Sequence, residues 1–266
     1  MFRTAFPERI DVAGASIELM SKGDGPPLLF LHAGHGVDAD DALVERLSRR
    51  HRVIVPSHPG FGASSRPAGV TGIDDICHVY LDLIEALDLK DLVLVGVSFG
   101  AWIAAELATM GTGRIKRLVL IDAVGVKVSG RETRDIKDIF GTTVEEIPDL
   151  FFHDPEKGKA AFHGFDFKNM SEEDVTRFVR NRESLLLFGW SPTLYNPKLL
   201  GRLHRVKVPV LLLWGEDDKV VGVDYGRRYA AAFPGATFEV IEGAGHYGYL
   251  EQPDEFAGRI DTFLAA

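Results

Sequence analysis

Cysteine and positive charge are scarce in this sequence, and each scarcity excludes a class of protein. Cys77 is the only cysteine among 266 residues, so no disulfide can form within the chain, and the CxxC motifs of zinc and redox sites are absent. Lys and Arg number 30 against 39 Asp and Glu, which gives a net charge of −9 at pH 7. Because there is no basic stripe to neutralise phosphates, nucleic-acid binding is not expected.

Long apolar runs are also missing. No stretch approaches the roughly 18 apolar residues that cross a bilayer, and the opening segment MFRTAFPERI contains no apolar core of signal-peptide length. We therefore expect a cytoplasmic protein without membrane insertion. Apolar residues still make up 45% of the chain, which is enough to build a core without metal or disulfide staples.

What the sequence does contain is an alternation of short apolar strands and amphipathic helices. The expected strands are 26–32, 51–56, 92–97, 115–122, 208–215 and 237–243. The expected helices are 38–49, 73–88, 99–110, 223–233 and 252–264. A pattern of alternating apolar and polar residues around Ala13-Gly14 predicts a hairpin before the first of these strands. Apolar strands joined by helices predict an α/β fold with a mostly parallel central sheet and helices on both faces.

The alternation is interrupted between residues 123 and 206. No buried strand is expected there, and charged helical segments dominate. We interpret 123–206 as a helical cap inserted into a core formed by 1–122 and 207–266. A segment inserted after strand 115–122 can cover the carboxyl ends of the strands, where open α/β sheets bind ligands.

The stretch VLVGVSFGAW, residues 93–102, places a serine between two glycines where a buried strand turns into a helix. A sharp turn of this kind strains the backbone of its central residue, and glycines on either side avoid steric collisions. The turn lifts the Ser98 hydroxyl above the sheet, near the positive end of the following helix. Gly96, Ser98 and Gly100 therefore predict a nucleophile elbow, although the GxSxG pattern alone has low specificity.

A serine nucleophile needs a base to accept its proton and a carboxylate to orient that base. Asp217 and Asp218 follow strand 208–215 in the sequence GEDD, and His246 follows the last strand in a glycine-rich loop. The chain order is therefore Ser, Asp, His. Asp122 also ends a strand, and it is either a further candidate acid or a cap of that strand end.

The motifs GVSFG, GEDD and GAGHYGYLEQPDEF, together with the helical insert, resemble the α/β-hydrolase fold superfamily over essentially the whole chain. The resemblance implies that Asp218 is the acid of a catalytic triad, with Asp217 as the alternative. It also implies an oxyanion hole made of backbone N–H groups, one from Phe99 and one from Gly34 in the sequence LHAGHG. Ala33 departs from the glycine that is commoner in relatives.

Four other residues are candidates for contact with a substrate. His35, just after the oxyanion loop, is either a pocket residue or a solvated loop histidine. Trp102 is either a pocket wall or a packing residue of its helix. Arg182 falls within an apolar helical stripe of the predicted cap, where it binds an anionic group, extends its charged end to solvent, or forms an ion pair within the cap. Tyr247 directly follows the candidate base.

A serine at the elbow excludes the relatives that open epoxides or displace halide, because these use a carboxylate there. It favours hydrolysis of esters, lactones or thioesters through an acyl-enzyme on Ser98. The interpretation that the sequence favours is a carboxylesterase-type enzyme for small, apolar, uncharged substrates. No metal or organic cofactor is implied, a small molecule is the expected partner, and nothing in the sequence indicates an oligomeric state.

Two alternatives stay open. Meta-cleavage product hydrolases of the same superfamily cleave a carbon–carbon bond in a dienoic diketo acid and use a cap arginine for the substrate carboxylate, a role that Arg182 fits. Ala33 and Tyr247 fit less well, because these relatives usually carry a glycine-richer oxyanion loop and a tryptophan after the catalytic histidine. The other alternative is a ligand-binding protein without turnover, since some members of this fold are receptors.

Overall fold

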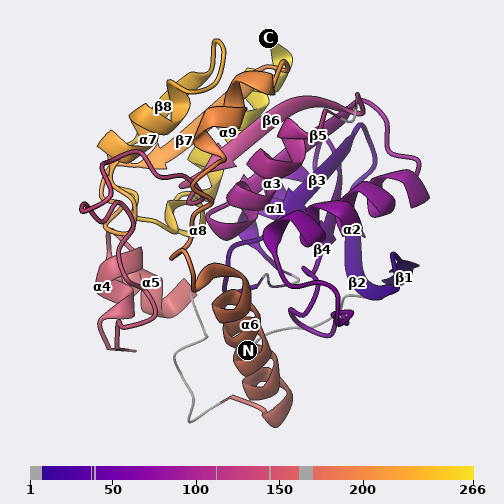
Figure 1. The fold of residues 1–266 in the computed structure, drawn as a ribbon, viewed down its shortest axis with the longest axis horizontal. Helices are drawn as coiled ribbons and strands as arrows, with labels where there is room; N and C mark the ends of the chain where they lie inside the picture. Colours follow the sequence, from indigo (N-terminus) through magenta and orange to yellow (C-terminus); the bar gives the residue numbers. More distant parts are fainter. Residues whose placement is uncertain (1–7, 37, 39, 112, 144, 162–169) are drawn as a thin grey trace.

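The computed structural model describes residues 8–36, 38, 40–111, 113–143, 145–161 and 170–266. Within these residues, eight strands form one sheet in the order β1-β2-β4-β3-β5-β6-β7-β8 (Figure 1). The strands are β1 (Glu8–Val12), β2 (Ala15–Lys22), β3 (Pro27–Leu31), β4 (Arg52–Pro56), β5 (Leu92–Val97), β6 (Ile115–Ile121), β7 (Val210–Gly215) and β8 (Thr237–Ile241). β2 is antiparallel to β1 and β4, and every other pair is parallel. The mostly parallel sheet that the sequence predicts is confirmed.

Burial differs between the centre and the edge of the sheet. All residues of β5 and β7 are buried, whereas β1 at the edge exposes most of its residues. Strands covered on both faces need continuous apolar sequence, which is what the central strands have. The edge hairpin turns at Ala13 and Gly14, whose φ angles of +49° and +74° match the twist of a two-residue hairpin loop.

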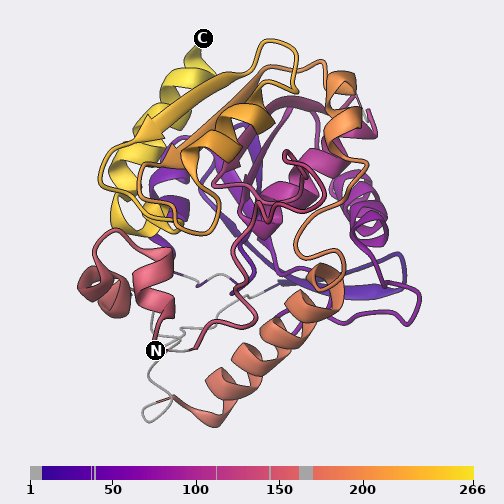
Figure 2. The ribbon, with the colours of Figure 1, turned by 60° about the vertical axis from the view of Figure 1, so that its left-hand side comes forward.

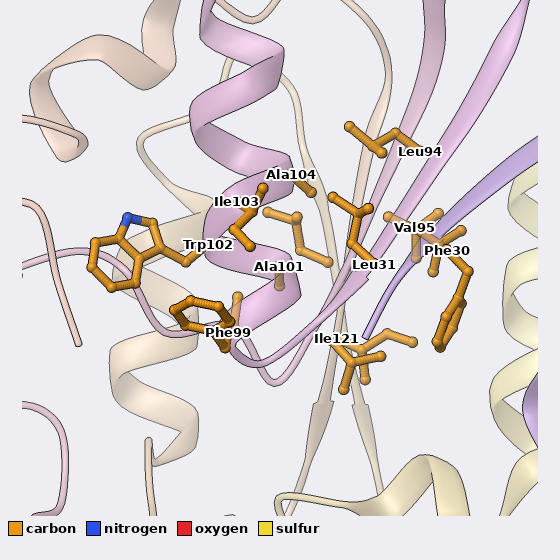
Figure 3. Packing of buried hydrophobic residues seen from close by; sticks show 14 of the residues in the cluster. Phe30, Leu31, Leu94, Val95, Phe99, Ala101, Trp102, Ile103, Ala104 and Ile121 are labelled. Atoms are coloured by element: carbon orange, nitrogen blue, oxygen red, sulfur yellow. The ribbon is translucent and has the colours of Figure 1, made fainter. Parts of the chain in front are cut away.

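Helices pack against both faces of the sheet. They are α1 (Ala42–Leu47), α2 (Ile73–Ala86), α3 (Phe99–Thr109), α7 (Val223–Ala230), α8 (Gly248–Glu251) and α9 (Pro253–Ala265). α3 packs on β3, β5 and β6 with α2 beside it, whereas α1 contacts α9. Figure 3 shows α3 on one side of the strands and Phe30 of β3 pointing to the other side. None of the helices that the structure describes is long and apolar enough to cross a membrane.

Helix α1 begins later than the sequence predicts. The Asp41 carboxylate accepts hydrogen bonds from the backbone N–H groups of Leu43 (2.9 Å) and Val44 (3.0 Å). Asp41 is therefore the N-cap, and its backbone is not helical, so the helix does not extend back toward residue 38.

The start of the predicted cap also differs from expectation. Residues 123–143 form turns rather than the charged helices that the sequence suggests. Gly125 pairs with Tyr195 in an isolated bridge, and the Asp135 carboxylate accepts hydrogen bonds from the N–H groups of Val128 and Ser129. These contacts satisfy backbone groups without a helix.

Three helices follow in the segment predicted as a cap: α4 (Ile147–Phe151), α5 (Pro155–Ala161) and α6 (Glu172–Gly189), before the short helix η2 (Leu200–Arg205). Figures 1 and 2 show α4, α5 and α6 outside the layers of the core, with α6 projecting furthest. The Ser184 hydroxyl of α6 donates to the Gly60 carbonyl oxygen at 2.8 Å, in the loop after β4. Helix α6 therefore lies over the carboxyl end of that strand.

A methyl group at Gly100 should disrupt the contact between α3 and β3. A Cβ at Gly100 would lie 2.1 Å from the Leu31 carbonyl oxygen, whereas a Cβ at Gly258 on the exposed surface of α9 would have no atom within 4 Å. We expect Gly100→Ala to lower the free energy of unfolding by about 1–3 kcal/mol or more. The matched variant Gly258→Ala should raise it by about 0.5–1 kcal/mol. Urea unfolding of both variants measures the difference, and equal effects would contradict the prediction.

Candidate active site

The turn between β5 and α3 holds Ser98 at φ +50° and ψ −109°, a conformation that residues with a side chain rarely adopt. Close packing on both sides explains the flanking glycines. A Cβ on Gly96 would lie 2.5 Å from the Gly100 carbonyl oxygen, and Gly100 itself has no room for a side chain against Leu31. The GxSxG spacing thus follows from two steric contacts around one strained residue.

Ser98, His246 and Asp218 come together from three different loops. His246 Nε2 lies 2.8 Å from Ser98 Oγ, and His246 Nδ1 lies 2.8 Å from Asp218 Oδ2. All three residues are buried. With Nδ1–H donating to the carboxylate, Nε2 is free to accept the serine proton, and Asp218 stabilises the imidazolium that results.

Backbone hydrogen bonds hold the Asp218 carboxylate in place. Its Oδ1 accepts from the N–H groups of Val220 (2.8 Å) and Val221 (2.9 Å), which leaves Oδ2 for the imidazole. Because two backbone donors already fix this carboxylate, its hydrogen bond to the histidine costs little further conformational entropy.

The other two candidate acids have different partners. Asp217 Oδ2 lies 2.6 Å from His153 Nδ1, in a half-exposed pair between the acid loop and the segment after α4. Asp122 is fully buried, and it accepts a hydrogen bond from the Gly215 N–H at 2.8 Å. Burial, reinforced by the charge of the neighbouring Asp218, raises the pKa of Asp122 well above its usual value. Asp122 therefore acts as a cap of the strand end in this structure.

The two backbone N–H groups expected in the oxyanion hole are those of Phe99 and Gly34. Among the residues that the structure describes, neither N–H donates to a protein acceptor. Phe99 is the first residue of α3, where N–H groups lack partners within the helix. Gly34 faces Leu185 of α6 so closely that a Cβ on Gly34 would lie 2.7 Å from a Leu185 methyl carbon.

Two histidines in close contact hold the loop that contains the candidate oxyanion donor Gly34. The ring centroids of His32 and His58 are 3.7 Å apart. His32 Nε2 accepts from the His58 N–H at 3.1 Å, so its Nδ1–H donates to the Ala33 carbonyl oxygen at 2.7 Å. His58 in turn bonds to the His32 carbonyl oxygen and to the Tyr80 hydroxyl. The pattern needs a neutral His32, since its Nε2 accepts a hydrogen bond, and burial lowers the pKa of His32 to about 4 and that of His58 well below its usual value.

A cavity lies beside this site, beneath α6. Its apolar wall is formed by Ile139, Ile147, Phe151, Phe178 and Leu185, and Gly34 also lines it. The Phe151 ring lies 5.4 Å from the His246 ring, which connects the cavity with the candidate base. Among the described residues, no group of three or more His, Cys, Asp or Glu side chains is arranged to hold a metal ion.

Three predicted contact residues, His35, Arg182 and Tyr247, line this cavity. The His35 ring packs against Tyr247 with centroids 4.6 Å apart, and burial lowers the pKa of His35 to about 3. The Arg182 side chain makes no hydrogen bond or ion pair with any residue that the structure describes. Of the alternatives that the sequence left open for Arg182, an ion pair within the described part of 123–206 is not observed, whereas its partial exposure is compatible with contact with solvent.

Of the two roles expected for Trp102, the structure supports packing against its surroundings rather than a place in the pocket wall. Its Nε1–H donates to Glu106 Oε1 at 3.4 Å, and its ring packs edge-on against Phe99 at 6.0 Å. A Cβ on Gly125 would lie 2.6 Å from the Trp102 ring, so the indole fills the space between α3 and the chain after β6. Trp102 is not among the described residues that line the cavity.

Asn181 is a pocket residue that the sequence analysis missed. It is buried on α6, it lines the cavity, and it bonds to two loops of the core. A signal was present in the sequence, since Asn181 lies three residues after Phe178 and four before Leu185, on the apolar stripe of the helix.

A family model described as the alpha/beta hydrolase fold matches residues 26–253, which is most of the chain. The chain belongs to the α/β-hydrolase fold family. The resemblance seen in the motifs is thereby confirmed, and at this level the protein is a hydrolase.

This α/β-hydrolase is similar to hydrolases that are named for different activities. It is 27% identical over 268 residues to 2-hydroxy-6-oxo-2,4-heptadienoate hydrolase of Pseudomonas putida, covering 95% of this chain and 94% of that protein. A meta-cleavage product hydrolase from Pseudomonas fluorescens matches with a TM-score of 0.77 at 22% identity over 97% of each chain. A malate-bound esterase from Thermogutta terrifontis matches with a TM-score of 0.78 at 22% identity, over 97% of this chain and 98% of the esterase. The two structural likenesses show the shared fold.

Burial should keep His32 and His35 neutral well below the pH at which a free imidazole is protonated. Their pKa values are lowered to about 4 and about 3, whereas in the unfolded chain they take up protons near pH 6.5. Their contribution to stability is therefore complete above about pH 6.5 and is lost as the pH falls toward 4. Ring ¹⁵N shifts, assigned with His32→Gln and His35→Gln, should stay those of neutral imidazole down to pH 5. An imidazolium signal at pH 6 would contradict this prediction.

Proposed function

We propose that this hydrolase acts through Ser98 on a small substrate that carries a carboxylate, and that it cleaves the carbon–carbon bond of a dienoic keto acid. The observation that carries the proposal is Arg182, a cation on the largely apolar wall of the cavity with no partner among the described residues. A guanidinium in such a place favours an anion, and its planar donors suit a carboxylate. The relative from Pseudomonas putida is named for a dienoate, which supports the same substrate class.

The mechanism begins with the Ser98 hydroxyl. His246 Nε2 takes the hydroxyl proton as Ser98 Oγ attacks the substrate carbonyl carbon, and Asp218 stabilises the imidazolium. Negative charge develops on the carbonyl oxygen, where the N–H groups of Phe99 and Gly34 can donate hydrogen bonds to it.

Breakdown of this adduct releases the leaving group and then the acid. The bond between the attacked carbon and the leaving carbon breaks, and the imidazolium of His246 gives its proton to the dienolate that departs. Water then attacks the acyl group on Ser98 with His246 again as the base, which frees the serine and a carboxylic acid. Arg182 would hold the carboxylate of the dienoate portion throughout, so the carbonyl is presented to Ser98 in one orientation.

The second candidate is hydrolysis of esters or lactones, the function that the sequence favoured. The same triad and oxyanion donors serve an ester without change, and an alkoxide leaves more readily than a carbon. Ala33 and Tyr247 support this candidate, because they depart from the pattern of the carbon–carbon hydrolases. A binding protein without turnover is disfavoured by the alignment of Ser98, His246 and Asp218, which a receptor does not need.

Asp218→Asn should lower kcat by roughly four orders of magnitude, because an amide would disturb the tautomer and orientation of His246. Asp217→Asn is the matched control, and it should have at most a few-fold effect because Asp217 pairs with His153 instead. Steady-state hydrolysis of a p-nitrophenyl ester measures both, with Ser98→Ala as the background. A larger effect of Asp217→Asn would show that the neighbouring carboxylate is the functional acid.

Arg182→Met should impair acidic substrates selectively. Loss of a charge-assisted hydrogen bond of roughly 1.5–3 kcal/mol lowers kcat/KM for a dienoic keto acid by about ten- to a hundredfold. Hydrolysis of neutral p-nitrophenyl butyrate should change only a few-fold. Arg180→Met is the matched control, because it removes the same charge from α6 at a residue that bonds to the Ser64 carbonyl oxygen. Equal losses for the acid and the ester in Arg182→Met would favour the neutral-ester function.

A further inference from the structure

Asn181 joins the helix α6 to two separate loops of the core. Its Oδ1 accepts a hydrogen bond from the Gly62 N–H at 2.7 Å, and its Nδ2 donates to the His35 carbonyl oxygen at 2.7 Å. The residue is only 6% exposed. The two backbone partners also fix the orientation of the amide, because a flipped amide would place donor against donor and acceptor against acceptor.

The His35 carbonyl oxygen, which accepts this hydrogen bond from Asn181, belongs to a tight turn. The Gly36 N–H donates to the Ala33 carbonyl oxygen at 3.0 Å, and Gly36 has a φ of +101°. A Cβ on Gly36 would lie 2.5 Å from Asn181 Nδ2, so the backbone of the turn approaches the amide as closely as glycine allows.

Because peptide bonds are planar, the hydrogen bond of Asn181 also constrains the candidate oxyanion hole. The His35 carbonyl and the Gly36 N–H belong to one rigid plane, and Asn181 holds that plane. The Gly36 N–H in turn holds the Ala33 carbonyl, which shares its plane with the Gly34 N–H. Two planes and two hydrogen bonds therefore connect the cap helix with the direction of the Gly34 N–H.

We propose that Asn181 is a positioning residue that aims the Gly34 N–H at the oxyanion formed when Ser98 attacks. The proposal rests on the proposed function of Ser98. Arg182, the next residue along α6, lines the cavity. One helix thus both orients the oxyanion loop and presents the side chain for the substrate carboxylate, so a shift of α6 would disturb both at once.

Ser184 provides a matched comparison on the same helix. Its hydroxyl donates to the Gly60 carbonyl oxygen at 2.8 Å, so it ties α6 to the loop after β4. Among the described residues, no hydrogen bond joins its side chain to the turn at 33–36. A general tethering role for α6 would make Ser184 and Asn181 equivalent, whereas a role in oxyanion geometry belongs to Asn181 alone.

The test is the rate at which a small neutral fluorophosphonate labels Ser98 in the full-length protein. Phosphonylation of Ser98 needs the oxyanion donors but no carboxylate on the reagent. The labelling rate therefore does not depend on the substrate class. We expect Asn181→Ala to slow labelling by about tenfold or more, because small misplacements of catalytic groups cost up to about a hundredfold. Asn181→Leu, which keeps more of the buried volume, should do the same. Ser184→Ala should label within about twofold of the unmodified chain.

Steady-state hydrolysis of p-nitrophenyl acetate adds a second readout. A loss of kcat with little change in KM is expected for both Asn181 variants, and thermal melting identifies variants that are folded. Labelling of folded Asn181→Ala or Asn181→Leu at the original rate would overturn the proposal, as would an equal loss in Ser184→Ala. If the unmodified chain is not labelled at Ser98, the proposed function fails as well. If Ser98 is labelled and only the Asn181 effect is missing, the positioning role alone fails.

Discussion

The close approach of α3 to the end of β3 is the constraint on which the rest of the site depends. At Gly100 the helix backbone comes so near to the Leu31 and His32 carbonyl oxygens that even a methyl group has no room. This contact forces the turn at Ser98 to be short and strained, and it leaves the first N–H groups of α3 beside the loop that continues from β3. The candidate nucleophile and the two candidate oxyanion donors thus lie on the two segments that meet at this packing contact.

The remaining parts of the site depend on chain segments that meet only after folding. Asp218 and His246 come from loops after β7 and β8, and backbone N–H groups lock the carboxylate before the imidazole binds it. Helix α6 closes the cavity from above through polar contacts with the core loops, including those of Asn181 and Ser184. These contacts are directional hydrogen bonds to backbone groups. They hold α6 in one position, whereas a purely apolar contact would let the helix slide.

The charge on the cavity wall supports the proposed anionic substrate over the neutral ester that the sequence favoured. The sequence favoured neutral esters because an arginine on an apolar stripe is commonly satisfied by a neighbour or by solvent. In the described structure Arg182 faces the cavity, and no acid is paired with it. Arg182 is half-buried, and a bound carboxylate would give its guanidinium the partner that it lacks among the described residues. The same helix also places the apolar residues Phe178 and Leu185 on the cavity wall, where the rest of the proposed substrate would lie.

The sequence by itself determined the sheet, the nucleophile and the triad candidates, because these features depend on local patterns. Buried strands need continuous apolar runs, and a strained elbow needs glycines at fixed spacing from Ser98. Only the tertiary structure placed Asp218, rather than Asp217, beside His246. It also packed Trp102 between α3 and Gly125 and placed Arg182 on the cavity wall. It also revealed Asn181, whose partner Gly62 lies 119 residues away. A helical stripe specifies which side chains share a face, but what that face meets is set by contacts between segments far apart in the chain.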